Sequence, residues 1–305
     1  MTARRAGIHI VHGAKVPSHP DPRDDGVTVV ASVSGGKDST ALSLWLTEQG
    51  IEHRRVHAGT GWEYRDHDDF MHYLQGKLGQ IDMVTGAEPM PVLIRRKGMF
   101  PGRLNRFCTS ELKVKPIAAY LQTLDTEVIN AVGIRAGESR ARAKLGEWEF
   151  NDRPFDCWVW RPLIAWTEAD VIDIHRRHGV KLNPLYDLGA NRVGCWPCIF
   201  ARKQEVRVVS ELSPDRIDEI EALEVHVQDA ARRRYAARGE TFESLGYSPP
   251  TFFSRGGNKM TTGIRDYVTW SKTSHGGKQV ELFHDPPEDG CMRWGLCETE
   301  PDQDV

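Results

Sequence analysis

Short apolar runs alternate along the chain with stretches in which apolar residues lie three and four positions apart, and this alternation predicts a sheet covered by helices. Short runs rich in valine, isoleucine and tryptophan are predicted strands: residues 27–33, 52–60, 91–96, 127–135 and 156–164. Stretches with apolar residues three and four positions apart are predicted helices: residues 39–49, 65–78, 110–124 and 167–178. Strands that alternate with helices favour a Rossmann-like, doubly wound α/β fold with a mostly parallel sheet. Ligands of such sheets bind at the carboxyl ends of the strands.

The pattern changes after about residue 200. Residues 213–239 predict one long helix, with Ser213 as its N-cap and Pro214 at its first position. The residues beyond this helix are rich in glycine and proline and show little periodicity. We therefore expect an N-terminal arm over residues 1–25, an α/β domain over residues 26–205, and a helical and irregular C-terminal extension over residues 206–305.

A glycine-containing loop joins the first predicted strand to the first predicted helix. Its residues are Ser34, Gly35, Gly36, Lys37, Asp38, Ser39 and Thr40. Free backbone N–H groups and the helix dipole favour an anion at a helix N-terminus, and glycines let the backbone approach it closely. The loop therefore predicts a phosphate site, although its spacing differs from that of Walker-type nucleoside triphosphatases. The alternative is an ordinary turn that Asp38 or Ser39 caps.

The loop, SGGKDST, resembles the SGGxDS signature of the PP-loop ATP pyrophosphatases. The resemblance implies an adenine nucleotide alpha hydrolase-like fold. It also implies that the loop binds ATP, or the phosphosulfates PAPS or APS, with Mg²⁺, and that ATP is cleaved between its α and β phosphates. Lys37 and Asp38 would then belong to the catalytic residues.

Residues 60–63, TGWE, extend the resemblance to the phosphoadenosine phosphosulfate (PAPS) reductases. They are similar to the Asp-Thr-Gly element of that family, with Gly59 in place of the aspartate. Thr60 and Gly61 would then contact the nucleotide. A glycine turn after a strand is the alternative.

Residues 133–143, GIRAGESRARA, resemble the Gly-x-Arg-x-x-Glu-Ser-x-x-Arg element of the same family. Guanidinium groups are suited to phosphate and sulfate oxygens, which implies a catalytic and nucleotide-binding role for Arg135. Glu138 and Ser139 would bind the nucleotide and orient the arginines. A solvated, charged helix start is the alternative.

Residues 183–200, NPLYDLGANRVGCWPCIF, resemble a region shared by these reductases and by DNA phosphorothioation proteins of the DndC type. Arg192 matches a family arginine, and we assign it to the catalytic residues on that resemblance. The similarity covers about residues 25–205. In DndC-type proteins the implied substrate is the DNA backbone.

The cysteines suggest a thiolate site. Cys195 and Cys198 form a Cys-x-x-Cys pair, which supplies half of the ligands of a zinc site or of an iron–sulfur cluster. Cys108 resembles a cluster ligand of adenylylsulfate reductases, and Cys291 or Cys297 would complete a 4Fe-4S set. The other of these two would be free to act as a nucleophile. Zinc bound by the same residues and unligated thiols are the alternatives, whereas Cys157 is expected in the core.

Composition limits the remaining possibilities. The 305 residues carry a formal net charge of −3, so no strong case for nucleic acid arises from the whole chain. Two basic clusters make a local case: Arg95, Arg96, Lys97, Arg103 and Arg106 with Phe100 and Phe107 between them, and Arg232, Arg233, Arg234 and Arg238. Solvated helix faces would explain them equally well. The histidines are expected to serve packing rather than metal binding.

The favoured function is ATP-dependent activation of a substrate for sulfur transfer, with nucleic acid as one candidate substrate and a protein as sulfur donor. The first alternative is a thioredoxin-dependent sulfonucleotide reductase that produces sulfite. The second is a nucleotide-binding regulator without catalytic activity. No apolar segment is long enough to span a bilayer, so we expect a cytoplasmic protein without membrane partners. The pattern does not predict an oligomeric state.

Overall fold

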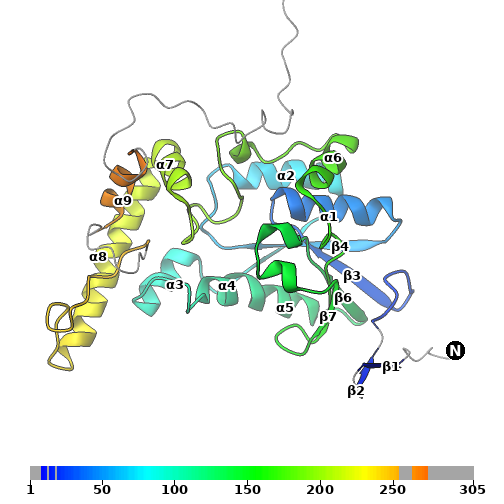
Figure 1. Ribbon diagram of the computed structural model, residues 1–305, viewed down its shortest axis with the longest axis horizontal. Helices are drawn as coiled ribbons and strands as arrows, with labels where there is room; N and C mark the ends of the chain where they lie inside the picture. The colour runs from blue at the N-terminus through cyan, green and yellow to red at the C-terminus, as the bar shows by residue number, and fades with distance from the viewer. Residues whose placement is uncertain (1–7, 12–13, 18, 254–262, 274–305) are drawn as a thin grey trace, which may run out of the picture. The chain divides into compact units, whose positions relative to one another are not determined.

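The computed structural model describes residues 8–11, 14–17, 19–253 and 263–273 (Figure 1). The chain divides into two compact units. The first comprises residues 1–58, 66–84 and 113–182, and the second comprises residues 59–65, 85–112 and 183–305. The chain therefore crosses from one unit to the other several times.

A six-stranded sheet in the order β5-β4-β3-β6-β8-β7 forms the centre of the first unit. Its strands are β3 (Val27–Ser32), β4 (His53–Gly59), β5 (Asp82–Thr85), β6 (Glu127–Ala131), β7 (Trp148–Asn151) and β8 (Cys157–Trp160). β3 pairs in parallel with β4 and β6, β6 pairs in parallel with β8, and β7 pairs antiparallel with β8. On one side of β3 the chain order runs outward through β4 to β5, and on the other side β8 lies beside β6, with the hairpin partner β7 at the edge. This confirms the predicted doubly wound, mostly parallel sheet.

Helices cover both faces of this sheet because its strands alternate apolar side chains between the faces. Val29 and Ala31 of β3 pack in one apolar cluster with residues of α1 (Lys37–Glu48), α2 (His67–Leu78) and α6 (Glu168–Arg177). Val30 points to the other face and packs in a cluster with Leu121 of α5 (Lys115–Leu121). Figure 1 shows α1, α2 and α6 on one side of the sheet and α5 on the other.

Shorter elements complete the first unit. β1 (Ile8–Val11) and β2 (Ala14–Pro17) form a separate antiparallel pair. The short 3-10 helices η2 (Ala136–Glu138) and η3 (Arg142–Lys144) follow β6. The π-helical turn η1 (Ser110–Val114) precedes α5, and its residues 110–112 belong to the second unit.

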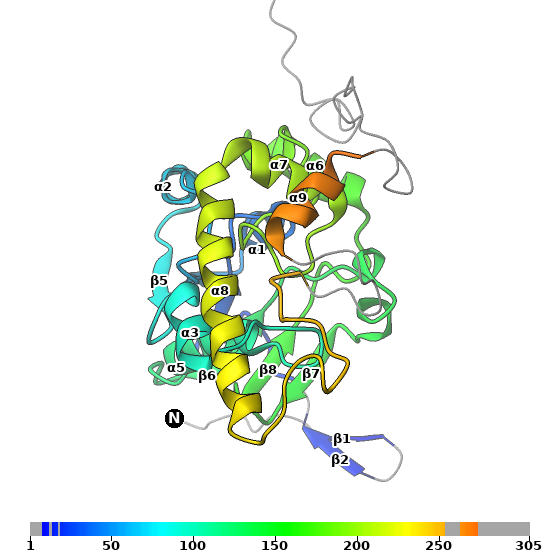
Figure 2. The ribbon, with the colours of Figure 1, turned by 90° about the vertical axis from the view of Figure 1, so that its left-hand side faces the viewer.

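The second unit is helical. Its elements are α3 (Met90–Lys97), α4 (Phe107–Thr109), η4 (Pro184–Tyr186), α7 (Lys203–Leu212), α8 (Pro214–Ala236) and α9 (Ile264–Ser271). Trp62, Leu93, Leu223 and Phe252 belong to its apolar core. Figure 2 shows the long helix α8 with α9 and α3 along it. None of the helices in the described part of the chain combines the length and apolar composition that crossing a membrane requires.

The structure corrects one predicted element. Residues 91–96 are not a strand, because they lie in α3. The buried residues Met90, Leu93 and Ile94 have the spacing of one helix face, and Gly98 ends the helix with a left-handed φ of +58°. The short elements that were not predicted include β5, β7 and α7.

The predicted long helix is confirmed as α8, with Ser213 at the N-cap position and Pro214 as its first residue. Ser213 makes no side-chain cap hydrogen bond. Its hydroxyl oxygen instead accepts a hydrogen bond from the indole Nε1 of Trp196 at 3.0 Å. The serine therefore links α8 to the Cys-x-x-Cys turn.

Candidate functional site

The predicted phosphate loop lies between β3 and α1, at the point where the strand order reverses. The N-cap of α1 is Gly36, which has no side chain to cap the helix. Ser39 instead shapes the loop, because its hydroxyl donates to the carbonyl of Gly36 and accepts from the backbone N–H of Ser34, both at 3.0 Å. Gly35 takes a φ of +76°, which favours glycine. Neither Asp38 nor Ser39 caps α1, so the first turn presents its backbone N–H groups without a side-chain cap.

Four charged side chains meet at this loop. The ammonium of Lys37 lies 3.7 Å from a carboxylate oxygen of Asp38 and 3.4 Å from one of Glu168. The guanidinium Nε of Arg135 donates to the other oxygen of Asp38. Lys37 and Arg135 are each only 7% exposed. Two buried cations are thus held in place by carboxylates, as a preorganised site for negative charge requires.

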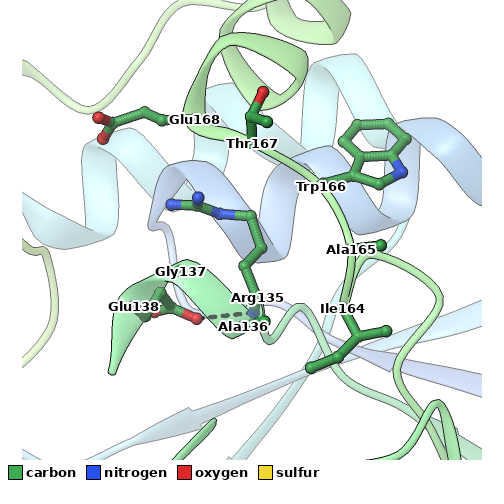
Figure 3. A pocket seen from close by; sticks show the side chains of 9 residues that line it. All are labelled: Arg135, Ala136, Gly137, Glu138, Ile164, Ala165, Trp166, Thr167 and Glu168. Carbon is green, nitrogen blue, oxygen red and sulfur yellow. Dashed lines mark hydrogen bonds between the residues drawn. The ribbon is translucent and has the colours of Figure 1, made fainter. Parts of the chain in front are cut away.

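A pocket of about 570 Å³ opens beside these charges, lined by residues 135–138 and 164–168 (Figure 3). The side chain of Arg135 extends across the pocket toward the segment that carries Thr167 and Glu168. Glu138 accepts a hydrogen bond from the backbone N–H of Arg135 at 2.8 Å, and its other carboxylate oxygen pairs with Arg142. The Ser139 hydroxyl accepts from the backbone N–H of Arg142 at 3.2 Å. Glu138 therefore fixes the backbone from which the Arg135 side chain starts.

Gly133 allows the segment after β6 to pack against the phosphate loop. A Cβ at this position would lie 2.6 Å from the carbonyl oxygen of Asp38 and 3.0 Å from the Cα of Ser39. Both neighbours are backbone atoms, so they could yield only by moving the loop. The first glycine of the GIRAGES motif therefore serves a close backbone approach.

Sequence reasoning missed two residues of this site, Glu168 and His175. Glu168 begins α6 and faces Lys37, but no local motif marks a carboxylate that a lysine far earlier in the chain will contact. His175 is 2% exposed, and its two ring nitrogens lie 2.9 Å from the carbonyl of Lys37 and 3.2 Å from that of Val180. Burial lowers the pKa of His175. The histidine therefore holds the first residue of α1 in place through the carbonyl of Lys37.

Two further histidines, His57 and His67, pack against the start of the loop. The Nδ1 of His57 is 2.8 Å from the carbonyl of Val33, the residue before the loop. The Nε2 of His67 is 3.2 Å from the Nε2 of His57, and both rings are buried. These rings contact the protein's own polar atoms and pack against the start of the loop.

The TGWE turn lies in the second unit and is held by its own glutamate. The carboxylate of Glu63 accepts hydrogen bonds from the backbone N–H and hydroxyl of Thr60 and from the backbone N–H of Trp62. Gly61 has a φ of +64°, and a Cβ there would lie 2.4 Å from the Cβ of Pro89. Thr60 is 2% exposed, so its hydroxyl is occupied inside the unit. A nucleotide contact by Thr60 and Gly61 stays a prediction.

This turn also holds the Cys-x-x-Cys segment. The backbone N–H of Trp196 donates to the carbonyl of Trp62 at 2.7 Å, and the indole of Trp62 donates to the carbonyl of Pro197 at 3.0 Å. The guanidinium of Arg216 lies 4.1 Å from the centre of the Trp62 ring. The positions of Cys195 and Cys198 are thus set by a turn far earlier in the chain. The hydrogen bond from the Trp62 indole to Pro197 joins residues 135 positions apart.

Cys108, Cys195 and Cys198 are all partly buried in the second unit. Burial is the main cause that raises the pKa of Cys108, and the charge of Cys198 contributes in the same direction. Within the described ranges, no three His, Cys, Asp or Glu side chains form a group that could hold a metal. Cys291 and Cys297 lie outside the described residues. The thiol chemistry fits a thiolate-bound metal, but the described residues alone do not complete its ligand set.

Two further predictions can be located. Cys157 is a buried core residue of β8, as expected, and burial raises the pKa of its thiol to about 11. Arg192 is exposed and belongs to the second unit, whereas Arg135 belongs to the first. A catalytic role of Arg192 stays a prediction.

Comparison with known proteins relates the chain to one family. Residues 28–201 match the model of the phosphoadenosine phosphosulfate reductase domain. An uncharacterized 37.8 kDa protein in the gpa 5′ region of Escherichia phage 186 is 31% identical in an alignment that covers 88% of this chain and 96% of the phage protein. The adenosine 5′-phosphosulfate reductase of Burkholderia cepacia is 35% identical over 98 residues, which cover 32% of this chain and 38% of the reductase.

Among solved structures, the phosphate complex of the phosphoadenylyl-sulfate reductase from Candida auris aligns with a TM-score of 0.44 and 18% identity. That alignment covers 55% of this chain and 81% of the reductase.

Proposed function

Because the chain belongs to the phosphoadenosine phosphosulfate reductase domain family, we propose that it binds ATP at residues 34–40 and cleaves it between the α and β phosphates. The cleavage would activate an acceptor for sulfur transfer. The arrangement around Asp38 carries this proposal: Lys37 and Arg135 are buried cations on one carboxylate, beside the uncapped start of α1 and an open pocket. The buried cations and the uncapped helix start support a polyphosphate rather than a neutral ligand.

The proposed reaction is a displacement at the α phosphorus. An acceptor oxygen attacks it, a new oxygen–phosphorus bond forms, and the bond to the bridging oxygen breaks with release of pyrophosphate. Lys37 and Arg135 stabilise the charge that develops on the phosphate oxygens. The terminal sulfur of a persulfide on a sulfur-donor protein then attacks the adenylated acceptor carbon or phosphorus, and AMP leaves. A second thiol of the donor protein attacks the remaining S–S bond, so that the donor ends as a disulfide and the sulfur stays on the acceptor.

Magnesium fits this site, because Mg²⁺ usually needs one or two protein carboxylates in addition to substrate phosphates. Asp38 and Glu168 are the carboxylates that face Lys37, and they would hold it. When bound, the ion would neutralise the departing pyrophosphate. A magnesium site completed by substrate phosphates needs fewer than three protein ligands, so it agrees with the lack of a three-residue metal-binding group among the described residues.

We extend the proposal to the thiols of the second unit. Cys108, Cys195 and Cys198 would join Cys291 or Cys297 as ligands of a 4Fe-4S cluster, with zinc as the alternative metal. Support comes from the location of these three thiols in one unit and from the hydrogen bonds that hold the Cys-x-x-Cys segment against Trp62. Anaerobic purification followed by iron, sulfide and zinc analysis tests this part. About four irons per chain support the cluster, stoichiometric zinc supports the alternative, and the absence of both metals contradicts a ligated site.

A sulfonucleotide reductase is the second candidate function, favoured by the 35% identity with an adenosine 5′-phosphosulfate reductase over 98 residues. The phosphate loop would then hold the nucleotide of a phosphosulfate. A cysteine thiolate would attack its sulfur, and thioredoxin would release sulfite. A regulator that binds nucleotide without turnover would release neither sulfite nor pyrophosphate.

The products released distinguish the ATP-cleaving enzyme, the sulfonucleotide reductase and the regulator. Pyrophosphate is measured after incubation with ATP and Mg²⁺, and sulfite after incubation with a phosphosulfate and reduced thioredoxin. We expect pyrophosphate and no sulfite. Lys37→Ala should reduce pyrophosphate release by about two orders of magnitude or more, since it removes a preorganised charge. Lys77→Ala is the matched control, because Lys77 is an exposed lysine of α2 in the same unit. Equal activity of the two variants would contradict the assignment of the loop.

A further inference from the structure

Two basic segments of the second unit, far apart in the chain, lie beside each other. The C-terminal half of α8 runs along the end of α3 (Figure 2). The ring Nε2 of His226 donates to the carbonyl of Arg95 at 3.1 Å, and Arg234 donates to the carbonyl of Gly98 at 2.9 Å. These partners are separated by 131 and 136 positions in the chain. Side chains of α8 thus donate hydrogen bonds to two carbonyl groups at the end of α3.

The contact between the two helices is tight. A Cβ on Gly98 would lie 2.9 Å from the Cβ of Ala230 and 3.0 Å from a guanidinium nitrogen of Arg234. Small residues at both positions allow the helices to approach closely, so the two segments form one fixed surface. We define the α3–α8 basic surface as Arg95, Arg96, Lys97, Arg103, Arg106, Arg232, Arg233, Arg234 and Arg238.

Carboxylates neutralise only part of this surface. Arg96 pairs with Glu88, and Arg232 pairs with Asp229. Four other arginines are exposed and have no ion pair with any residue that the structure describes: Arg95, Arg103, Arg233 and Arg238. No aspartate or glutamate occurs within residues 95–110 or 230–239. In a chain with a net charge of −3, this is a local excess of positive charge.

A turn within the surface presents an apolar tip between two cations. The backbone N–H of Gly102 donates to the carbonyl of Asn105 at 3.0 Å and closes the turn. Leu104 is 101% exposed, and Arg103 and Arg106 on either side of it are exposed as well. The guanidinium of Arg106 lies 5.3 Å from the ring centre of Phe200, which is 40% exposed. Cations for phosphates combined with apolar and aromatic groups for bases are typical of nucleic-acid surfaces.

Structural needs of the helices explain only some of these residues. Arg95, Arg96 and Lys97 form the last turn of α3, where positive charge stabilises the helix dipole. Arg234 caps the same helix. The same dipole effect applies to Arg233 and Arg234 in the last turn of α8 and to Arg238 next to its C-cap. Neither reason applies to Arg103, which lies in the turn.

We propose that the α3–α8 basic surface binds the phosphate backbone of a nucleic acid, with Leu104 placed against its bases. The inference rests on the proposed function in one respect, because it makes a polynucleotide the acceptor of the activation. DNA and RNA share the backbone chemistry that the arginines would recognise, and the experiment distinguishes them.

The test is fluorescence anisotropy of the full chain with labelled duplex DNA, single-stranded DNA and RNA of one sequence, between about 50 and 200 mM salt. Arg103→Ala/Arg238→Ala should weaken binding about tenfold or more and reduce the slope of log K against log salt by about 2. The matched control, Arg23→Ala/Arg176→Ala, removes two exposed arginines of the first unit and should bind as the unmodified protein does. Leu104→Ser should weaken binding without changing the slope.

The inference is overturned if none of the three oligonucleotides binds at the lowest salt, or if both double variants lose the same affinity. ATP binding and pyrophosphate release by the same preparations distinguish it from the proposed function. Pyrophosphate release without oligonucleotide binding contradicts the surface alone. Oligonucleotide binding without ATP cleavage contradicts the proposed reaction and leaves the surface standing.

Discussion

Positive charge is placed differently at the phosphate loop of the first unit and at the α3–α8 basic surface of the second. In the first unit, Lys37 and Arg135 are 7% exposed and are paired with carboxylates. In the second unit, the side chains of Arg96 and Arg232 are 59% and 56% exposed, and several neighbours have no carboxylate partner in the described chain. Burial with a partner fixes a cation at one point, which suits a reacting phosphate. An exposed cation is free to adjust its position and its charge is screened by salt. Such cations suit contact with a long polyanion.

Removal of Arg135 should give the largest effect on stability. Arg135→Ala breaks a buried ion pair with Asp38 and should lower the free energy of unfolding by about 3 kcal/mol. Urea denaturation measures this change. Arg233→Ala is the control in the second unit and should change stability by less than about 0.5 kcal/mol. Similar losses for both variants would remove the contrast between the units.

Gly133→Ala should lower stability and nucleotide affinity together, because its Cβ would lie 2.6 Å from a backbone oxygen of the phosphate loop. We expect a loss of about 1–3 kcal/mol, as for other overpacked sites. Calorimetry with ATP and thermal unfolding measure the two effects. Gly76→Ala is the control, since nothing lies within 4 Å of a Cβ at this position of α2. An unchanged affinity in Gly133→Ala would contradict the close approach.

Lowering the pH should change the stability of the two units in opposite directions. Burial lowers the pKa of His175, so the unfolded chain binds more protons and stability falls as the pH drops below about 6.5. Burial raises the pKa of Glu224, which accepts hydrogen bonds from the backbone of Phe252 and Ile264. For Glu224 the native state binds more protons, so stability rises as the pH drops toward 4.5.

Hydrogen exchange at pH 7 and pH 5 measures both effects. Protection of α6 should decrease at pH 5, and His175→Asn should make that decrease smaller. Glu224→Gln should remove the increase in protection that α8 and α9 show at pH 5. A decrease of the same size in all three helices would contradict the assignment.

The smallest effect should come from exposed arginines. Arg95→Ala should leave thermal unfolding nearly unchanged, because its side chain makes no ion pair within the described residues. Loss of its charge from the last turn of α3 should cost little, and the main expected loss is in oligonucleotide affinity. A large drop in unfolding temperature would show that the surface serves the fold.

The sequence was most informative where local pattern decides the structure. The valine-rich run before residue 34 and the glycines after it predicted β3, the loop and the start of α1. Residues 91–96 were assigned wrongly because a short apolar run fits a strand as well as a helix, and the stop signal at Gly98 decides for the helix. β5 and β7 are short and half-exposed, so they lack a clear apolar pattern.

Contacts across long stretches of chain could not be predicted in the same way. The bond between Arg135 and Asp38 joins positions 97 apart, and the one between His175 and Lys37 joins positions 138 apart. These contacts depend on the order of the strands rather than on any local motif. The support of the Cys-x-x-Cys turn by Trp62 has the same origin. Resemblance to a family suggested the residue types, but only the fold brings Glu168 and His175 to the loop.

The most direct test of the central claim is phosphorus NMR of the products formed from ATP and Mg²⁺ by the full chain, with and without an oligonucleotide. The account predicts AMP, free or attached to the acceptor, together with pyrophosphate, and loss of both in Lys37→Ala. Formation of ADP and inorganic phosphate would contradict it, because the bond broken would then lie between the β and γ phosphates.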